Sequence, residues 1–247
     1  MKGVDVNGAK GAIDWRLVKA AGFGFAFVKA TEGRTFDDER FSFNRRAAKA
    51  AGLVVGAYHY ARPDNNTPEA EAEHFLRVAR PKRGELLPAL DWETDPPTAA
   101  WALRFLRAVE CEIGRSPILY TYPEFLRRTG HLSDFHCFPL WYSRFGPNDG
   151  QIHGASPPPG FRFAVHQFTS AGQVDGIEGR ADLNVLKLRS IRELVFYGAP
   201  SSAEDIVAPD EAELPPSPEG DGFVGRAVEE ADRRRLEVEQ FEPVPVG

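Results

Sequence analysis

The run Leu86-Leu87-Pro88-Ala89-Leu90 is apolar and leads directly into Asp91-Trp92-Glu93. An apolar run of this length, followed by a Pro-rich turn, predicts a buried strand over residues 86–92. Side chains two residues apart in a strand share a face, so Asp91 and Glu93 point in one direction and Trp92 points to the opposite, core side. The stretch therefore predicts a strand that presents two carboxyl groups at its carboxyl end.

Comparable runs recur as far as about residue 194 and predict the other strands and helices. Further strands are predicted at Gly3–Val6, Phe23–Ala30, Val54–Tyr60, Pro117–Thr121, Phe138–Tyr142, Arg162–Phe168 and Leu183–Leu186. Helical patterns lie between them at Asp14–Ala21, Phe41–Ala51, Pro68–Arg80, Thr98–Ile113 and Pro123–Thr129. Asp14 is a typical helix N-cap, and Gly22 and Gly52 are typical residues at helix ends.

Strands that alternate with helices predict a parallel sheet joined by crossover helices. About eight strands, with a helix after most of the early ones, indicate an α/β fold of the modified (β/α) barrel type. The last third of the pattern lacks helices, so we expect the barrel to be irregular there. An open doubly wound sheet is the alternative architecture.

In both architectures the chemistry belongs at the carboxyl ends of the strands. Asp5 ends the first predicted strand, Thr31-Glu32 follow the second, and Asp91 and Glu93 end the fourth. Paired carboxyl groups in one site can hold different protonation states, which is what glycoside hydrolysis requires. The alternative reading of Asp91-Trp92-Glu93 is a solvated strand end before a turn.

The composition is that of a soluble globular protein, with 247 residues, 42% hydrophobic and 27% charged. No apolar run approaches the ~20 residues of a membrane helix, so we expect no membrane partner. The N-terminus has no apolar segment typical of a secretory signal, so we expect none. The two cysteines, Cys111 and Cys137, are expected to be buried as small apolar residues, and a single bridge between them stays open.

The charge divides the chain into a main body and a tail. Residues 198–247 carry 4 basic and 13 acidic residues, whereas residues 1–197 carry 26 basic and 23 acidic ones. The main body lacks the concentrated basic stripe of a nucleic-acid binder. We therefore predict a catalytic barrel over residues 1–197, a Pro-rich acidic linker over 198–222, and a non-globular charged tail with a helix over 223–247.

The order of several motifs resembles glycoside hydrolase family 25, the lysozymes (N-acetylmuramidases) of bacteria, fungi and bacteriophage endolysins. The resemblance covers roughly residues 1–190. Its motifs are Gly3-Val4-Asp5-Val6, Asp14-Trp15, Gly24 to Gly33, Asn44, Ala50-Ala51-Gly52-Leu53, Gly56-Ala57-Tyr58-His59-Tyr60, Asp91-Trp92-Glu93, Leu140-Trp141 and Asp182-Leu183-Asn184.

By position, the resemblance implies catalytic roles for Asp5, Asp91, Glu93 and Asp182, with Glu93 as the general acid. A carboxyl group that has three others around it has a reason to hold its proton. Asp91 would orient the 2-acetamido group of the muramic acid sugar; in the rival scheme Asp91 or Asp182 stabilises the oxocarbenium ion or activates water.

Four residues are predicted to contact the substrate, namely Tyr58, Tyr120, Trp141 and Gln167. The resemblance places Tyr58 in the sugar-binding groove, and packing with a solvated hydroxyl is the alternative for it. Trp141 is equally consistent with a core position. His166 stands where the family usually has Trp, and we interpret it as a core histidine or a substrate contact. His59 is interpreted as structural. Lys29 and Glu32 either brace the acid cluster as a buried pair or are solvated.

The resemblance implies a peptidoglycan hydrolase without cofactor or metal. The alternatives are an inactive wall-binding or virion protein on the same scaffold, and a phosphoesterase that binds a hard metal ion through the four acids. The lack of a visible signal favours a phage enzyme that acts on the bacterial wall, or export by another route. Residues 223–247 are a possible contact to a virion or phage protein.

Overall fold

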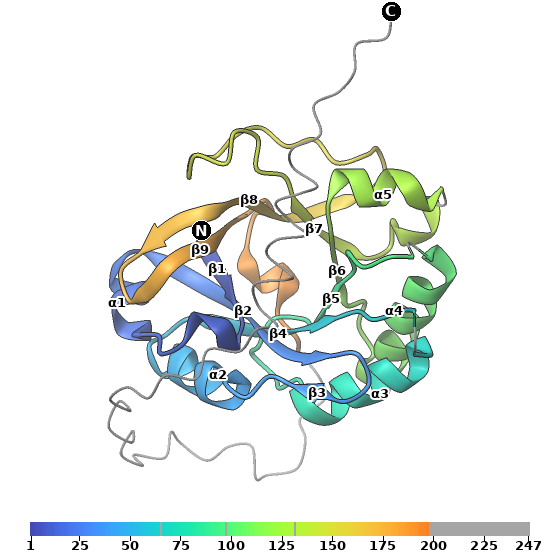
Figure 1. Ribbon diagram of the computed structural model, residues 1–247, viewed down its shortest axis with the longest axis horizontal. Helices are drawn as coiled ribbons and strands as arrows, with labels where there is room; N and C mark the ends of the chain where they lie inside the picture. Colours follow the sequence, from blue (N-terminus) through green and yellow to red (C-terminus); the bar gives the residue numbers. More distant parts are fainter. Residues whose placement is uncertain (65, 97, 131, 198–247) are drawn as a thin grey trace, which may run out of the picture. The chain divides into compact units, whose positions relative to one another are not determined.

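The computed structural model describes residues 1–64, 66–96, 98–130 and 132–197. Eight of the strands in this part of the chain form a closed barrel (Figure 1). They are β1 Lys2–Val6, β2 Phe23–Glu32, β4 Val54–Tyr60, β5 Ala89–Asp91, β6 Ile118–Thr121, β7 Pro139–Ser143, β8 Arg162–Val174 and β9 Ile177–Leu186. The two-residue strand β3, Phe36–Asp37, pairs only with the end of β2.

The pairing of β1 with β2 closes the barrel and excludes the open doubly wound sheet. Strands β1, β2 and β4 to β8 all run parallel to one another in this ring. Strand β9 is antiparallel to both β8 and β1. The predicted modified (β/α) barrel with an irregular last third is therefore confirmed.

Five α-helices lie in the five connections that join the first six parallel strands of the barrel, from β1 to β7, outside the ring of strands (Figure 1). They are α1 Trp15–Ala20, α2 Phe41–Ala50, α3 Pro68–Ala79, α4 Ala99–Ile113 and α5 Pro123–Thr129. Asp14 caps α1 as predicted, since its side chain accepts hydrogen bonds from the backbone of Arg16 and Leu17. None of the helices in the described residues has the length and apolar composition needed to cross a membrane.

Three predicted strands differ most in length from those in the structure. Strand β5 begins only at Ala89, because Pro88 has no N–H for a ladder hydrogen bond and the Leu87 N–H donates instead to the Leu194 carbonyl at 2.7 Å. Strands β8 and β9 extend beyond their predicted bounds because they form one long hairpin. This hairpin turns at Gly176, whose φ of 95° favours glycine.

Two apolar cores flank the sheet. The outer core packs the helices against the outside of the barrel. The inner core fills the barrel with the residues Phe25, Phe27, Tyr58, Leu86, Leu87, Ala89, Ile118, Tyr120, Trp141, Ala164, Val165, Leu194 and Val195. The last two belong to the segment that contains the 3-10 helix η3, Ile191–Leu194, which hydrogen-bonds to residues 84–87 before β5 and so closes the amino end of the barrel.

The expectation for the cysteines is wrong. Cys111 and Cys137 are both free and exposed. Cys111 lies on the outward face of α4, and the thiol of Cys137 accepts a hydrogen bond from Arg107 at 3.4 Å. Apolar character alone does not bury a side chain whose helix face points to solvent. The linker predicted over 198–222 and the helical tail predicted over 223–247 lie outside the described residues.

Candidate functional site

Two aspartates of the predicted acid cluster lie on the adjoining strands β1 and β9, and a third lies on β5, elsewhere in the ring. Asp5 is directly opposite Asp182 in the ladder of β1 and β9. Asp91, at the end of β5, is in register with Tyr60 of β4 and Tyr120 of β6. Asp5 and Asp91 are buried, with 9% and 8% of their surface exposed. Because β9 is antiparallel to β1, a residue from the middle of β9, Asp182, lies beside Asp5 near the carboxyl end of β1.

The charges of these three acids act on one side chain, the hydroxyl group of Tyr58. Burial raises the pKa of its hydroxyl, and the charges of Asp5, Asp91 and Asp182 raise it further. Asp38 also contributes to this shift, although the sequence pattern did not single it out. The Asp38 carboxylate accepts hydrogen bonds from the backbone N–H groups of Gly8 at 2.7 Å and Arg40 at 2.9 Å, and burial raises its own pKa. Asp38 follows a short hairpin and belongs to no periodic apolar pattern, so no pattern in the sequence predicts it.

The charge of Glu93 acts on two tyrosines at the same end of the barrel. The pKa of Tyr60 is raised by burial and by the charges of Glu93 and Asp91. Burial and the charge of Glu93 likewise raise the pKa of Tyr122 to about 12. Glu93 is partly exposed, while Trp92 between the two acids is fully buried in the outer core, as predicted. Glu93 therefore borders the acid cluster on the side of β4 and β6.

A chain of side-chain amides holds Asp5 in place. One carboxylate oxygen of Asp5 accepts hydrogen bonds from Gln167 Nε2 at 2.9 Å and from Asn184 Nδ2 at 2.7 Å. The Asn184 carbonyl oxygen accepts the indole N–H of Trp141 at 2.7 Å. The Gln167 carbonyl oxygen accepts the hydroxyls of Tyr120 at 3.0 Å and Ser143 at 2.9 Å. Because each amide is used at both its N and O atoms, the orientation of the Asp5 carboxylate is fixed.

The four residues predicted to contact substrate are all buried. The exposed fractions are 6% for Tyr58, 3% for Tyr120, 2% for Trp141 and 1% for Gln167. Trp141 stacks on Phe27 with ring centroids 4.3 Å apart. The structure thus brings all four together beneath the acid cluster, where they can position the acids. Their contact with substrate stays a prediction.

Lys29 and Glu32 form an ion pair, the first of the two alternatives for these residues, and Arg62 joins it. The Glu32 carboxylate accepts from Lys29 Nζ at 2.5 Å and from Arg62 Nε at 2.7 Å. Burial raises the pKa of Glu32, but Lys29 and Arg62 outweigh this effect and hold the pKa below its ordinary value. Both cations also lie over the ring of Tyr60, at 4.8 Å and 4.9 Å from its centroid. The pair therefore adjoins the tyrosine that neighbours Glu93.

The two histidines singled out by the sequence are both structural. His59 is fully buried, with Nε2 2.8 Å from the Glu71 carboxylate and Nδ1 2.8 Å from the Thr31 hydroxyl. His166 is 1% exposed, and its Nε2 lies 2.8 Å from the Arg144 carbonyl oxygen. Burial lowers the pKa of both rings, so both favour the neutral form.

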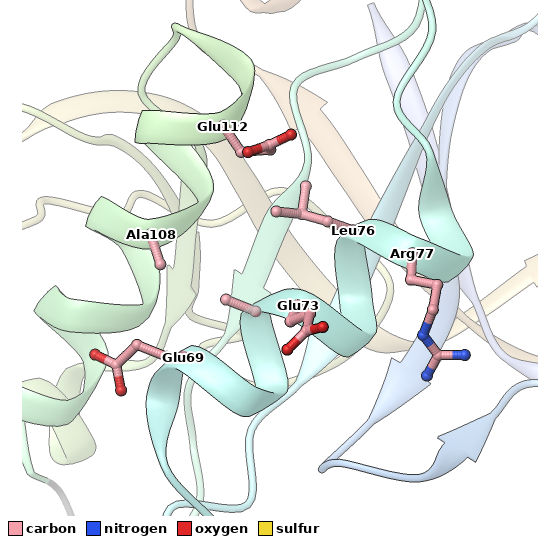
Figure 2. Close-up of a pocket in the computed structure, with 7 residues that line it drawn as sticks. Glu69, Glu73, Leu76, Arg77, Ala108 and Glu112 are labelled. Carbon is pink, nitrogen blue, oxygen red and sulfur yellow. The ribbon is translucent and has the colours of Figure 1, made fainter.

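An open hollow of about 460 Å³ lies between α3 and α4, on the outside of the barrel. Figure 2 shows Glu69, Glu73 and Arg77 of α3 and Glu112 of α4 around it. These charged groups are exposed and solvated. None of the residues of the acid cluster lines this hollow. Among the described residues, no group of three or more His, Cys, Asp or Glu side chains is arranged to hold a metal ion.

Comparison with known proteins identifies the family. Residues 4–177 match the model of glycosyl hydrolases family 25. The chain is 31% identical over 201 residues to lysozyme M1 of Streptomyces globisporus, a match that covers 74% of this chain and 67% of that protein.

Solved structures give the same result. The bacterial lysozyme from Streptomyces coelicolor superposes with a TM-score of 0.71 at 30% identity, over 78% of this chain and 95% of that one. A family 25 glycosyl hydrolase from Bacillus anthracis superposes with a TM-score of 0.68 at 28% identity, over 81% of this chain and 94% of that one.

Proposed function

The chain belongs to glycosyl hydrolase family 25, and we propose that it cleaves the β-1,4 bond between N-acetylmuramic acid and N-acetylglucosamine in peptidoglycan. Family membership makes it a glycoside hydrolase of the lysozyme type, with the bacterial cell wall as its site of action. The observation that supports the finer assignment is the convergence of Asp5, Asp91 and Asp182 around Tyr58, with Glu93 beside Tyr60.

In this proposal Glu93 is the general acid. Its carboxyl group donates a proton to the glycosidic oxygen as the bond to the muramic acid C1 breaks, and N-acetylglucosamine leaves with a free hydroxyl. Glu93 is partly exposed at the carboxyl end of the barrel, which is the position that a proton donor to a polymer needs. Water then adds to C1 and returns a proton to the site.

Asp91 stabilises the positive charge that develops on the sugar ring. It does so either directly, or by orienting the 2-acetamido group so that the carbonyl oxygen of this group attacks C1. Asp5 and Asp182 add negative charge around the same point. Because Gln167 and Asn184 already fix Asp5, its charge does not need to reorient during the reaction.

Digestion of purified peptidoglycan tests the proposal. The released fragments are reduced with borohydride and identified by mass, with Glu93→Gln as the inactive control. A muramidase leaves new reducing ends on N-acetylmuramic acid; new reducing ends on N-acetylglucosamine would contradict the bond assignment. Binding to walls with no new reducing ends would support the alternative, a wall-binding or virion scaffold. Loss of activity in EDTA, restored by magnesium, would support the metal-dependent alternative.

A further inference from the structure

Phe36 is a large apolar side chain with 52% of its surface exposed. It belongs to β3, where it lies opposite Glu32, while its neighbour Asp37 lies opposite Thr31. Partners that are directly opposite in an antiparallel ladder share a face of the sheet. Phe36 therefore lies on the face of Glu32, and Asp37 lies on the face of Thr31.

The contacts of Thr31 and Asp37 establish the direction of their face of the hairpin, and Phe36 lies on the opposite face. Thr31 contacts His59 in the layer between the barrel and the helices, and Asp37 lies 2.6 Å from Nε2 of His74 on α3. That face is turned toward the helices. Phe36 is therefore turned away from them, toward the open carboxyl end of the barrel where the acid cluster lies.

Side-chain contacts connect Phe36 to the acid cluster. The Lys29 ammonium lies 5.5 Å from the centroid of the Phe36 ring and 4.8 Å from that of Tyr60. Tyr60 in turn neighbours Glu93, whose charge acts on its hydroxyl. Phe36, Lys29 and Tyr60 thus form a continuous row of contacts that leads from the acid cluster to an exposed aromatic ring.

The ring is held on a fixed backbone. The hairpin that carries it is tied to β4 by a hydrogen bond from the Gly33 N–H to the Tyr60 carbonyl at 3.1 Å. Nδ1 of His74 lies 2.8 Å from the Gly33 carbonyl oxygen. The Asp38 N–H donates to the Ala30 carbonyl at 2.9 Å. A rigid, exposed aromatic ring binds a partner with little loss of conformational entropy.

We propose that Phe36 is a stacking platform for one sugar of the peptidoglycan strand. This sugar lies beyond the two sugars that the cleaved bond joins. The inference rests on the proposed function, because it assumes that the glycan crosses the acid cluster. A pyranose ring has an apolar C–H face that packs on an aromatic ring while its hydroxyl groups stay in water. Lys29 and Arg62, both paired with Glu32, are the cations beside the ring that would meet the carboxylates of muramic acid and its stem peptides.

Chain-length dependence tests the platform. Phe36→Ala should raise KM for long glycan strands by roughly 2- to 10-fold with kcat unchanged, since an aromatic contact of this kind contributes about 0.5–1.5 kcal/mol. The shortest glycan fragment that the enzyme cleaves should show no change, because it does not reach the ring. Phe36→Tyr should behave as the wild type. Leu17→Ala is the matched control, since Leu17 is 49% exposed on α1.

Binding provides a readout that does not depend on catalysis. In the Glu93→Gln background, Phe36→Ala should weaken co-sedimentation with long peptidoglycan strands by the same factor, and Leu17→Ala should not. Equal binding and equal KM for Phe36→Ala and Leu17→Ala would overturn the platform, as would an equal loss on long and short substrates. If the wild-type enzyme releases no N-acetylmuramic acid reducing ends, the proposed assignment of the cleaved bond is wrong. The binding comparison still tests the role of Phe36 in that case.

Discussion

The two ends of the barrel interior are built from different residues. At the amino end, Leu86, Leu87, Leu194 and Val195 pack together and the η3 segment closes the opening. At the carboxyl end, the charges of Asp5, Asp91 and Asp182 all act on Tyr58. The first end buries apolar surface and stabilises the fold. The carboxyl end holds like charges and buried polar groups close together. These groups lower the stability of the fold and provide the proposed catalytic side chains. Substitutions at the two ends should therefore have separable effects.

The largest expected effect is at the carboxyl end. Glu93→Gln should lower the rate of peptidoglycan hydrolysis by about 10²- to 10⁴-fold, because the amide keeps the shape of the side chain but cannot donate the proton. The unfolding midpoint should stay the same, since Glu93 is partly exposed. Reducing-end release and thermal unfolding, measured on the same preparation, check both points. Near wild-type hydrolysis would remove Glu93 from the acid role.

The opposite result is expected at the amino end. Leu194 is fully buried in the inner core, so Leu194→Ala should lower the free energy of unfolding by about 2–5 kcal/mol. Activity per folded molecule should be retained at temperatures below the lowered midpoint. Urea unfolding and an assay at low temperature test this prediction. A large loss of kcat in the folded variant would mean that the two ends are not separable.

A smaller loss of stability is expected near the amino end for Glu85→Gln. The Glu85 carboxylate accepts from Arg45 Nε and Lys49 Nζ, each at 2.9 Å. Burial raises the pKa of Glu85, but Arg45 and Lys49 outweigh it, so the pKa lies below its ordinary value of 4.5. The variant should lose about 2 kcal/mol of stability at neutral pH.

The sign of the pH dependence follows from the lowered pKa of Glu85. The carboxylate stabilises the fold fully above pH 4.5, and this contribution is lost as the pH falls through the pKa of the folded state. The difference in stability between wild type and Glu85→Gln should therefore shrink in acid. A difference that grows as the pH falls would contradict the assignment.

The smallest effect is expected from deletion of residues 198–247. The segment carries a net charge of −9 and many prolines, and η3 already closes the inner core. Hydrolysis of soluble fragments and the thermal midpoint should be nearly unchanged, while lysis of anionic whole walls at low salt should rise slightly. An unfolded truncation product would show that the domain boundary at residue 197 is misplaced.

Local patterns predicted most of the fold and part of the site. Strand alternation placed Trp92 in the core, because this relation depends on neighbouring residues; the shared face of Asp91 and Glu93 stays a prediction, since β5 ends at Asp91. The contact of Asp5 with Asn184 joins residues 179 positions apart, so only the closed barrel reveals it. Asp38 could not be predicted either, since its position depends on a two-residue strand.

The central claim, that Glu93 donates the proton, is tested most directly with an activated substrate. A dinitrophenyl glycoside of the glycan has a leaving group that departs as a stable anion and needs no proton. Glu93→Gln should lose its activity on peptidoglycan but keep most of its activity on this substrate. Asp91→Asn should lose both activities, because it acts on the charge of the ring. An equal loss on both substrates for Glu93→Gln would contradict the account.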